Sequence, residues 1–537
     1  MVRLRMTVGF IANDLGKVML RRTISPCLAM CFVLSIVCNV SQVLADVKLP
    51  SVFSDHMVLQ RDTPIKIWGW AERAEYITVT LGDHSLSTPT DKFGNWTAIL
   101  PPMLATNQPQ VLKVSGKNTI EIRDVLIGEV WLCSGQSNME WRVERAADAA
   151  TEIAAGDYPE IRHFDVPHRV SPKPLDDVSA KWEVCSPASV NHFTAVGYFM
   201  ARKLHQELKV PIGLLNASWG GTRIEPWTPP EGLRSVPALE SIYDSVIGRT
   251  PGSPSYRKRL DEFLAANDRW ASIARRSRTT NTLIDPPPAY PTELISFGRN
   301  TDPTVLFNGM VNGLVGYSMR GAIWYQGESN HTEGMLYFEK KKALIKGWRD
   351  LWGLGDFPFY FVQIAPFDYN DEQPETLAEL WEAQSAAAAE IPNTGMVVTN
   401  DIATLKDIHP PNKQDVGIRL ANLALRNDYG RAALMARSPS LRSYEVVGRK
   451  LRVMFDDTAG GLKTRDGKPP TYFEIAGRKT PEFVPAVVDI DGDSVLLRSD
   501  DVTEPVAFRF AWHKLAEPNL TGGTGLPVPA CRGGKAD

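Results

Sequence analysis

Three polar segments of the chain carry hydroxyls, amides and glycines in an arrangement that could support attack on a carbonyl group. They are Ser-Gly-Gln-Ser-Asn-Met at 134–139, Ser-Trp-Gly-Gly-Thr at 218–222 and Gln-Gly-Glu-Ser-Asn at 326–330. Each directly follows a compact apolar run, of the kind that forms a parallel strand buried on both faces. Ligands bind outside the carboxyl ends of such strands. We therefore expect the three segments to meet at one crevice, although any one of them alone would be an ordinary turn.

The residues of this crevice divide by chemical role. Ser137 follows a buried strand and opens an expected helix, which makes it the candidate nucleophile. Gly220 and Gly221 can bring backbone N–H groups close to a ligand, and Gln326 and Asn330 offer side-chain amide donors. Together with the Ser137 N–H, these donors form a candidate oxyanion hole. The candidate substrate contacts in the same three segments are Gln136, Trp219 and Glu328.

A serine nucleophile needs a general base, and the chain has nine histidines. Only His331 and His409 follow an expected core strand at the correct end. His409 stands in the sequence Asp-Ile-His-Pro at 407–410, just before a helix expected from about Asn412. This context favours His409 as the base over a structural role.

The apolar runs and their flanking segments predict an α/β fold. Strands are expected at 126–133, 212–217, 321–325, 357–364 and 396–399, and helices at 195–208, 337–351, 376–389 and 413–425. Such alternation is typical of a doubly wound parallel sheet. A polar, Arg-rich helical insertion at about 229–305 interrupts the alternation and could cover or flank the site. Short strands separated by turn residues predict a β domain on each side of this core.

The predicted organisation is a signal peptide at 1–45, an N-terminal β domain at 46–125, the catalytic domain at 126–430 and a C-terminal β domain at 431–537. The leader has the basic pair Arg21-Arg22, a 12-residue apolar run from Cys27 to Cys38 and a cleavage site near Ala45. The alternative is a membrane anchor, which the short apolar run disfavours. We expect a secreted or periplasmic protein with no membrane association after cleavage.

The composition narrows the function classes further. A net charge of −3 disfavours a nucleic-acid binder, and no CxxC, HExxH or phosphate-loop motif is present. We therefore expect neither metal nor organic cofactor. Three cysteines remain after the leader, namely Cys133, Cys185 and Cys531. Either Cys133 pairs with Cys185 or all three are buried thiols.

Four blocks of the chain resemble those of the sialate O-acetylesterases, a branch of the SGNH hydrolases. They are Trp-Leu-Cys-Ser-Gly-Gln-Ser-Asn-Met-Glu-Trp at 131–141, Ser-Trp-Gly-Gly-Thr at 218–222, Trp-Tyr-Gln-Gly-Glu-Ser-Asn at 324–330 and Asp-Ile-His-Pro at 407–410. The flanking β segments are similar too, including Asp-His-Met-Val-Leu-Gln at 55–60. The resemblance implies an SGNH-like core that removes O-acetyl groups from sialic acid or a related acetylated sugar. It implies that Ser137 attacks the acetyl carbonyl, with His409 as base.

The third member of the triad departs from the superfamily pattern. SGNH hydrolases commonly place the acid three residues before the histidine, where this chain has Lys406. Pro410 pushes His409 toward an extended conformation, in which residues i and i+2 point to the same side. Asp407 is therefore the candidate acid, with Asp401 and Glu328 as rivals.

Two other functions remain open at this stage. One is an esterase of the same fold that acts on acetylated xylan or another polysaccharide. The other is a secreted, non-catalytic carbohydrate-binding protein, which the presence of Ser137, His409 and the oxyanion donors disfavours.

Overall fold

The computed structural model describes residues 46–370 and 373–535. The predicted signal peptide lies outside the described residues. The centre of the fold is a run of six parallel strands in the order β13-β12-β11-β7-β10-β8. Their bounds are β7 Thr119–Gly135, β8 Ile161–Asp165, β10 Ile212–Ser218, β11 Gly321–Tyr325, β12 Phe359–Val362 and β13 Thr394–Val397. Strand β9 (Trp182–Val184) adds an antiparallel edge, so the sheet is mixed.

Burial explains why these segments form strands. Every residue of β10, β11 and β12 is buried, as expected for strands covered on both faces. The order of connection reverses at β7, because the chain first places β8 and β10 on one side of it and then β11, β12 and β13 on the other. Such a reversal leaves a crevice at the carboxyl end of the strand where it occurs.

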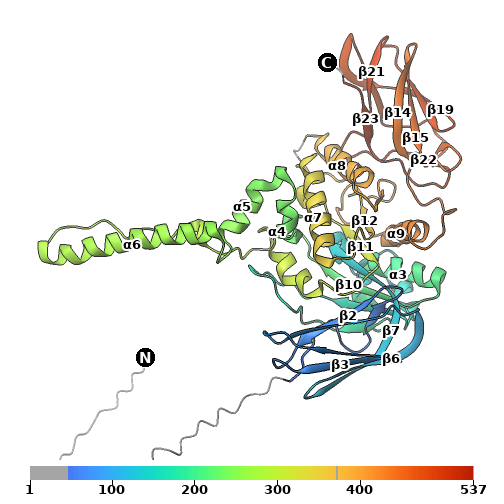
Figure 1. The fold of residues 1–537 in the computed structure, drawn as a ribbon. Coiled ribbons are helices and arrows are strands. Elements are labelled where there is room, and N and C mark those ends of the chain that lie inside the picture. Colours follow the sequence, from blue (N-terminus) through green and yellow to red (C-terminus); the bar gives the residue numbers. More distant parts are fainter. Residues whose placement is uncertain (1–45, 371–372, 536–537) are drawn as a thin grey trace, which may run out of the picture. The chain divides into compact units, whose positions relative to one another are not determined.

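Four long helices cover the sheet in two pairs. They are α3 Ala195–Leu208, α7 Leu336–Trp352, α8 Thr376–Glu390 and α9 Lys413–Asn427. Helix α3 packs against α9 and helix α7 against α8, with β11 and β12 between the pairs in Figure 1. The approach of α9 to α3 is close, since a Cβ on Gly417 would lie 2.6 Å from the Cβ of Phe199. The predicted helices agree with these within two residues at each end.

The N-terminal β region is joined to the core through β7. Its strands are β1 Val58–Gln60, β2 Ile65–Trp70, β3 Tyr76–Leu81, β4 His84–Pro89, β5 Asn95–Leu100 and β6 Thr106–Ser115. Strand β6 pairs antiparallel with the first half of β7, and β1 pairs parallel with its middle. The sequence predicted a core strand at 126–133 that follows the N-terminal β domain, whereas the structure has one strand that begins at Thr119. Asp124 stays within this strand with a φ of 55°. The division at residue 125 remains a prediction, and β7 runs through it.

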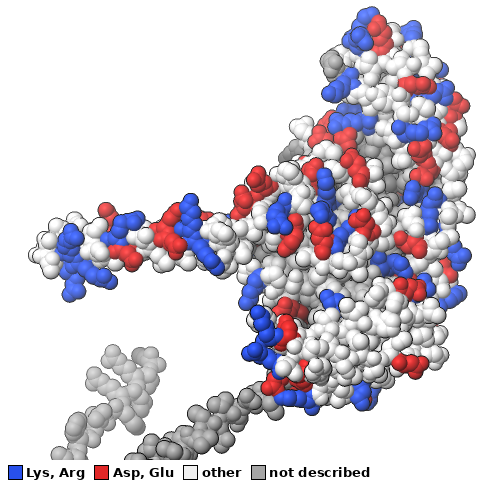
Figure 2. Space-filling model, viewed as in Figure 1, with Lys and Arg blue, Asp and Glu red and all other residues white. Residues whose placement is uncertain are grey.

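The insertion and the C-terminal region are helical and β, respectively. Helix α5 (Glu240–Gly248) and the 27-residue helix α6 (Pro254–Thr280) belong to the insertion, and no residue of α6 is buried. Figure 2 shows basic and acidic side chains interspersed along it. After β14 (Ser440–Val447) the chain forms antiparallel sheets, with the orders β14-β15-β20-β19 and β18-β17-β21-β23. The bounds are β15 Lys450–Asp456, β17 Phe473–Gly477, β18 Thr480–Pro485, β19 Val487–Asp491, β20 Ser494–Arg498, β21 Pro505–Phe510 and β23 Cys531–Gly533.

Three features bear on the earlier expectations. Cys133, Cys185 and Cys531 are free thiols, and the first two are buried. Within residues 46–370 and 373–535, no helix has the length and apolar character needed to cross a membrane. In the same ranges, no group of three or more His, Cys, Asp or Glu side chains is arranged to hold a metal ion.

Candidate active site

Strand register brings the three polar segments together. Gly135, at the end of β7, pairs with Ser218 of β10 on one side and Tyr325 of β11 on the other. Gly135 has a φ of 136°, and a Cβ there would lie 2.2 Å from the carbonyl oxygen of Tyr325. Only glycine fits this backbone and this approach. The three loops therefore leave the sheet at one level, as the sequence predicted.

Ser137 and His409 are in direct contact. Ser137 is half-buried at the start of the short helix α1 (Ser137–Glu140), and its Oγ lies 2.8 Å from Nε2 of His409. His409 lies in the loop between β13 and α9. Burial lowers its pKa, Asp407 opposes this effect, and the positive charges of Lys413 and Arg145 reinforce it. A neutral imidazole at this distance can accept the serine proton.

Asp407 lies beside the other nitrogen of the imidazole. Its Oδ1 accepts a hydrogen bond from the backbone N–H of His409 at 2.9 Å and lies 3.5 Å from Nδ1. The side chain of Asp407 is 59% exposed. The predicted i, i+2 relationship thus brings the carboxylate close to the ring, at a distance longer than a normal hydrogen bond.

The two rival carboxylates are engaged elsewhere. Asp401 receives two hydrogen bonds from the guanidinium of Arg419, at 2.8 and 2.6 Å. Glu328 is buried and accepts a hydrogen bond from Nδ2 of Asn138 at 2.6 Å. Burial raises the pKa of Glu328, and its second oxygen has no hydrogen-bond partner in the described part of the chain. Neither carboxylate has a hydrogen bond or ion pair with His409 among the described residues.

The glycine loop lies next to Ser137. A Cβ on Gly220 would be 3.1 Å from Oε2 of Glu140 and 3.2 Å from the Cβ of Ser137, a tight approach that another residue could make only if these side chains shifted. The N–H of Gly220 donates to Oε2 of Glu140 at 2.6 Å. No backbone hydrogen bond is found for the N–H of Ser137 or Gly221 within the described ranges. Gly221 has a φ of 72°, a conformation that favours glycine.

The two predicted amide donors are not directed toward Ser137. Both N–H groups of Gln326 are used, by the carbonyl of Thr222 and by Oδ1 of Asn330. Both N–H groups of Asn330 are likewise used, by the carboxylates of Glu225 and Glu333. An amide nitrogen has only two hydrogens to donate. The structure therefore leaves neither side chain with a free donor, and their role in the oxyanion hole stays a prediction.

The three predicted substrate contacts differ in exposure. Gln136 is buried, and its Oε1 accepts the N–H groups of Gly327 and Ser329, which ties the first loop to the third. Glu328 is also buried. Trp219 is half-buried and stacks on His168, with ring centres 4.2 Å apart. In this structure, Trp219 has the most accessible surface of the three.

Several residues of the site were not identified from the sequence. The ring of Trp141 stacks on His409 at 4.9 Å, and the guanidinium of Arg145 lies 3.8 Å from the centre of the Trp141 ring. Lys413 donates to Oδ1 of Asn138, and burial lowers the pKa of this lysine to about 7. Trp141 belongs to the block at 131–141, which was the available signal. The roles of Arg145 and Lys413 depend on contacts that the sequence does not reveal.

A polar cavity of about 230 Å³ adjoins the glycine loop. Its lining includes Glu140, Arg142, Asp165, His168, His192, Asn216 and Ser218. Oε1 of Glu140 lies 3.1 Å from Nε2 of His168. The pocket therefore places acidic and basic groups beside the loop that carries Gly220.

Comparisons with known proteins relate the chain to carbohydrate esterases. A family model described as carbohydrate esterase, sialic acid-specific acetylesterase, matches residues 127–259 and 299–426. The gap in the match contains most of α6. The sialate O-acetylesterase of Mus musculus is 28% identical over 511 residues, covering 87% of this chain and 89% of that protein. The sialate O-acetylesterase of Homo sapiens is 27% identical over 443 residues, covering 75% of each.

One solved structure is similar over nearly its whole length. A carbohydrate acetylesterase from Xanthomonas citri is 34% identical, with a TM-score of 0.76, and the match covers 91% of this chain and 99% of that one. The family resemblance predicted from the four blocks is confirmed. The chain belongs to the sialic acid-specific acetylesterase family of carbohydrate esterases, and it is an enzyme, a carboxylic ester hydrolase.

Proposed function

We propose that this protein is a secreted serine esterase that removes O-acetyl groups from sialic acid or related acetylated sugars through an acetyl-enzyme intermediate. The observation that carries the proposal is the 2.8 Å distance between Oγ of Ser137 and Nε2 of His409. A nucleophile and a base within hydrogen-bond reach, at the carboxyl end of a parallel sheet, are the requirements for this reaction.

The reaction would proceed in two halves. In the first, His409 accepts the Ser137 proton while Oγ bonds to the acetyl carbonyl carbon, and the carbonyl oxygen becomes an oxyanion. The oxyanion then collapses, the bond to the sugar oxygen breaks, and that oxygen takes the proton from His409. In the second half, His409 removes a proton from water as the water oxygen attacks the acetyl carbonyl carbon. The bond from this carbon to Oγ then breaks, Oγ takes the proton from His409, and acetic acid leaves and ionises to acetate. No metal or cofactor is required for these steps.

The oxyanion would be stabilised by backbone donors. The N–H groups of Ser137 and Gly221 have no backbone partner in the described ranges, and that of Gly220 is held by Glu140. Donors fixed before the reaction are effective because they need no reorganisation as charge develops. Asp407 would orient the imidazole and stabilise its protonated form.

A second candidate substrate is an acetylated neutral polysaccharide such as xylan. It is favoured by the pocket beside Gly220, which is lined by the carboxylates of Glu140 and Asp165. Sialic acid carries a carboxylate of its own, which these groups would repel. Arg142 in the same pocket and Arg145 beside Trp141 would instead attract that carboxylate.

Kinetic measurements on the purified enzyme distinguish the two candidate substrates. We expect a higher kcat/KM on O-acetylated sialic acid than on acetylated xylo-oligosaccharides, measured by acetate release. A clear preference for the xylan fragments would assign the polysaccharide function. Enzyme that released acetate from neither substrate, and also failed on p-nitrophenyl acetate, would contradict the esterase proposal itself.

Secretion is a separate part of the proposal and rests on the leader sequence. Expression in a secretion-competent host, followed by N-terminal sequencing of the product, is expected to give a mature chain that begins near Asp46. A product that retained residues 1–45 and stayed in the membrane fraction would support the anchor instead.

A further inference from the structure

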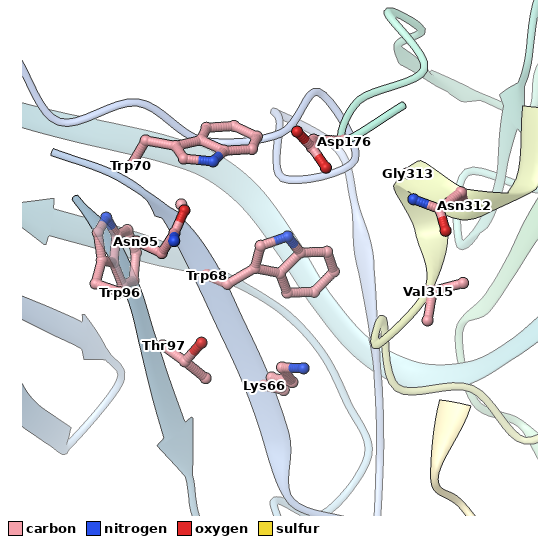
Figure 3. A pocket seen from close by; sticks show the side chains of 11 residues that line it. Lys66, Trp68, Trp70, Asn95, Trp96, Thr97, Asp176, Asn312, Gly313 and Val315 are labelled. Carbon is pink, nitrogen blue, oxygen red and sulfur yellow. The ribbon is translucent and has the colours of Figure 1, made fainter. Parts of the chain in front are cut away.

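A cavity of about 330 Å³ lies on the outward face of strands β2 and β5, in the N-terminal β region. Figure 3 shows its lining. The strands contribute Lys66, Trp68, Gly69, Trp70, Asn95, Trp96 and Thr97, and the facing side is formed by Asp176, Asn312, Gly313 and Val315. Nothing in the proposed reaction uses these residues.

Strand alternation presents two tryptophans on this face. Side chains at i, i+2 and i+4 share one face of a strand, so Lys66, Trp68 and Trp70 all project outward from β2. Both tryptophans are partly exposed, whereas Ile65 and Ile67, on the other face of β2, are buried in the core. The indole N–H groups of Trp68 and Trp70 have no hydrogen-bond acceptor within residues 46–370 and 373–535. The face therefore offers aromatic surface together with free donors.

Polar groups line the rest of the cavity. Across the β2–β5 pair, Thr97 stands opposite Trp68 and Asn95 stands opposite Trp70. In Figure 3 both indoles extend from β2 toward the side of the cavity where Asp176 and Asn312 lie. Nδ2 of Asn312 donates to the carbonyl of Leu175 at 3.1 Å, which fixes the side chain. Its Oδ1 has no hydrogen-bond partner in the described part of the chain.

The cavity is remote from Ser137. The segment 312–315 precedes β11, so it lies at the amino end of the parallel strands, whereas Ser137 follows their carboxyl end. The hydroxyl of Tyr317 donates a hydrogen bond to the carbonyl of Val58, and Val58 pairs with Leu126 of β7. From Leu126 to Gly135, β7 extends roughly 30 Å at about 3.3 Å per residue. A ligand in this cavity would thus be bound at the opposite end of the parallel strands from Ser137.

We propose that this cavity is a second saccharide-binding site, which takes a segment of a neutral sugar chain. Indole faces are flat and apolar and match the C–H face of a pyranose ring, while Asp176, Asn312 and Thr97 can exchange hydrogen bonds with its hydroxyls. The volume falls at the lower end of the range for small-ligand sites. The charges of Lys66 and Asp176 offset each other, so the lining has no net charge, as suits a neutral sugar. The site would hold the enzyme on a polymer independently of the ester bond at Ser137.

The proposal is tested by direct binding of unacetylated xylohexaose to the full chain carrying Ser137→Ala, measured by calorimetry and by quenching of tryptophan fluorescence. We expect saturable binding that Trp70→Ala weakens by about tenfold or more, because stacked aromatics dominate such contacts. Thr97→Met, which fills the cavity without removing packed atoms, is expected to weaken binding as well. Phe93→Ala, an exposed aromatic residue of the same region outside the cavity, is the matched control and is expected to leave the Kd unchanged.

The outcomes separate this site from the active site. Thermal unfolding of each variant checks that the fold is retained, and Thr97→Met keeps the test valid if Trp70→Ala unfolds. Absence of binding to xylohexaose, or binding that Trp70→Ala and Thr97→Met both leave intact, would overturn the proposal. Tighter binding of N-acetylneuraminic acid than of xylohexaose at this cavity would also overturn it. None of these results depends on the esterase reaction, since Ser137 is replaced throughout.

Discussion

Oε2 of Glu140 accepts the backbone N–H of Gly220 at 2.6 Å, while Oε1 of the same carboxylate lies 3.1 Å from Nε2 of His168. Burial raises the pKa of Glu140, but the hydrogen bonds to His168 and Gly220 outweigh it and hold the pKa below its usual value. The bond to Glu140 in turn raises the pKa of His168. A charged carboxylate therefore accepts the N–H of Gly220, in the loop next to Ser137.

The first prediction concerns the competition between Glu140 and a substrate oxyanion for the N–H of Gly220. A hydrogen bond from an N–H to a charged carboxylate is roughly twice as strong as one to a neutral amide. Glu140→Gln should therefore release the Gly220 N–H more readily and raise kcat on p-nitrophenyl acetate by on the order of a few-fold. Glu144→Gln, on the adjoining turn, is the control and should leave kcat unchanged. A fall of more than about tenfold in the Glu140 variant would mean that the carboxylate holds the glycine loop in place.

The second prediction concerns the nucleophile. Ser137→Ala should lower kcat by on the order of 10⁴ on any acetyl ester, because the attacking oxygen is lost. The side chain is half-buried, so the melting temperature should change little. Ser329→Ala, in the third loop, is the matched control and should retain activity. If the Ser137 variant kept more than about a tenth of the wild-type rate, the serine mechanism would be wrong.

The third prediction separates the two candidate acids. Asp407→Asn should lower kcat roughly 10- to 100-fold, because the amide no longer stabilises the protonated imidazole. Asp401→Asn should instead weaken the pair with Arg419, whose side chain is only 13% exposed, as is that of Asp401. We expect a loss of on the order of 2 kcal/mol in unfolding free energy and little change in kcat.

Parallel kinetics and thermal unfolding of both variants check this double comparison. The reverse ranking in kcat would assign the acid to Asp401. Small and equal effects on kcat would indicate a Ser–His dyad, in which Asp407 only anchors the backbone N–H of His409.

Local signals in the sequence were enough to predict the elements of the core. The expected helix at 195–208 coincides with α3, and the expected strand at 321–325 coincides with β11. Short strands with charged residues gave no such signal. Strand β8 contains Arg162 and His163, yet both side chains are buried, because β8 lies in the sheet between β10 and β9. The core strand was predicted to begin at 126 because a compact apolar run starts there, and only the pairing of β7 with β6 shows that the strand extends back to Thr119.

The sequence was enough to predict those site residues whose positions follow from the ends of the core strands. Ser137 and Gly220 could be placed together because they follow β7 and β10, which lie side by side, and His409 because it follows β13 at the same end of the sheet. The hydrogen-bond partners of the Gln326 and Asn330 side chains could not be predicted in this way. Their donors are taken by groups distant in sequence, such as Thr222 and Glu225, and an amide in the sequence does not reveal which way it faces.

The last prediction concerns the pH dependence of the reaction. His409 must be neutral to accept the Ser137 proton, so kcat/KM should rise with pH through the pKa of His409 and then level off. Burial lowers this pKa below the usual value of 6.5, and the positive charge of Arg145 lowers it further. Because a nearby cation disfavours the protonated imidazole, Arg145→Gln should raise the pKa and move the acidic limb of the profile to higher pH.

Arg142→Gln is the control for this shift. It removes an exposed positive charge of the same segment that is not among the main causes of the lowered pKa of His409, so its acidic limb should lie close to that of the wild type. The kcat/KM profiles should be measured on p-nitrophenyl acetate, which has no charge that either arginine could attract. A limb that moved to lower pH in the Arg145 variant would contradict the charge effect. An unchanged limb would mean that the stacked indole of Trp141 screens His409 from the guanidinium.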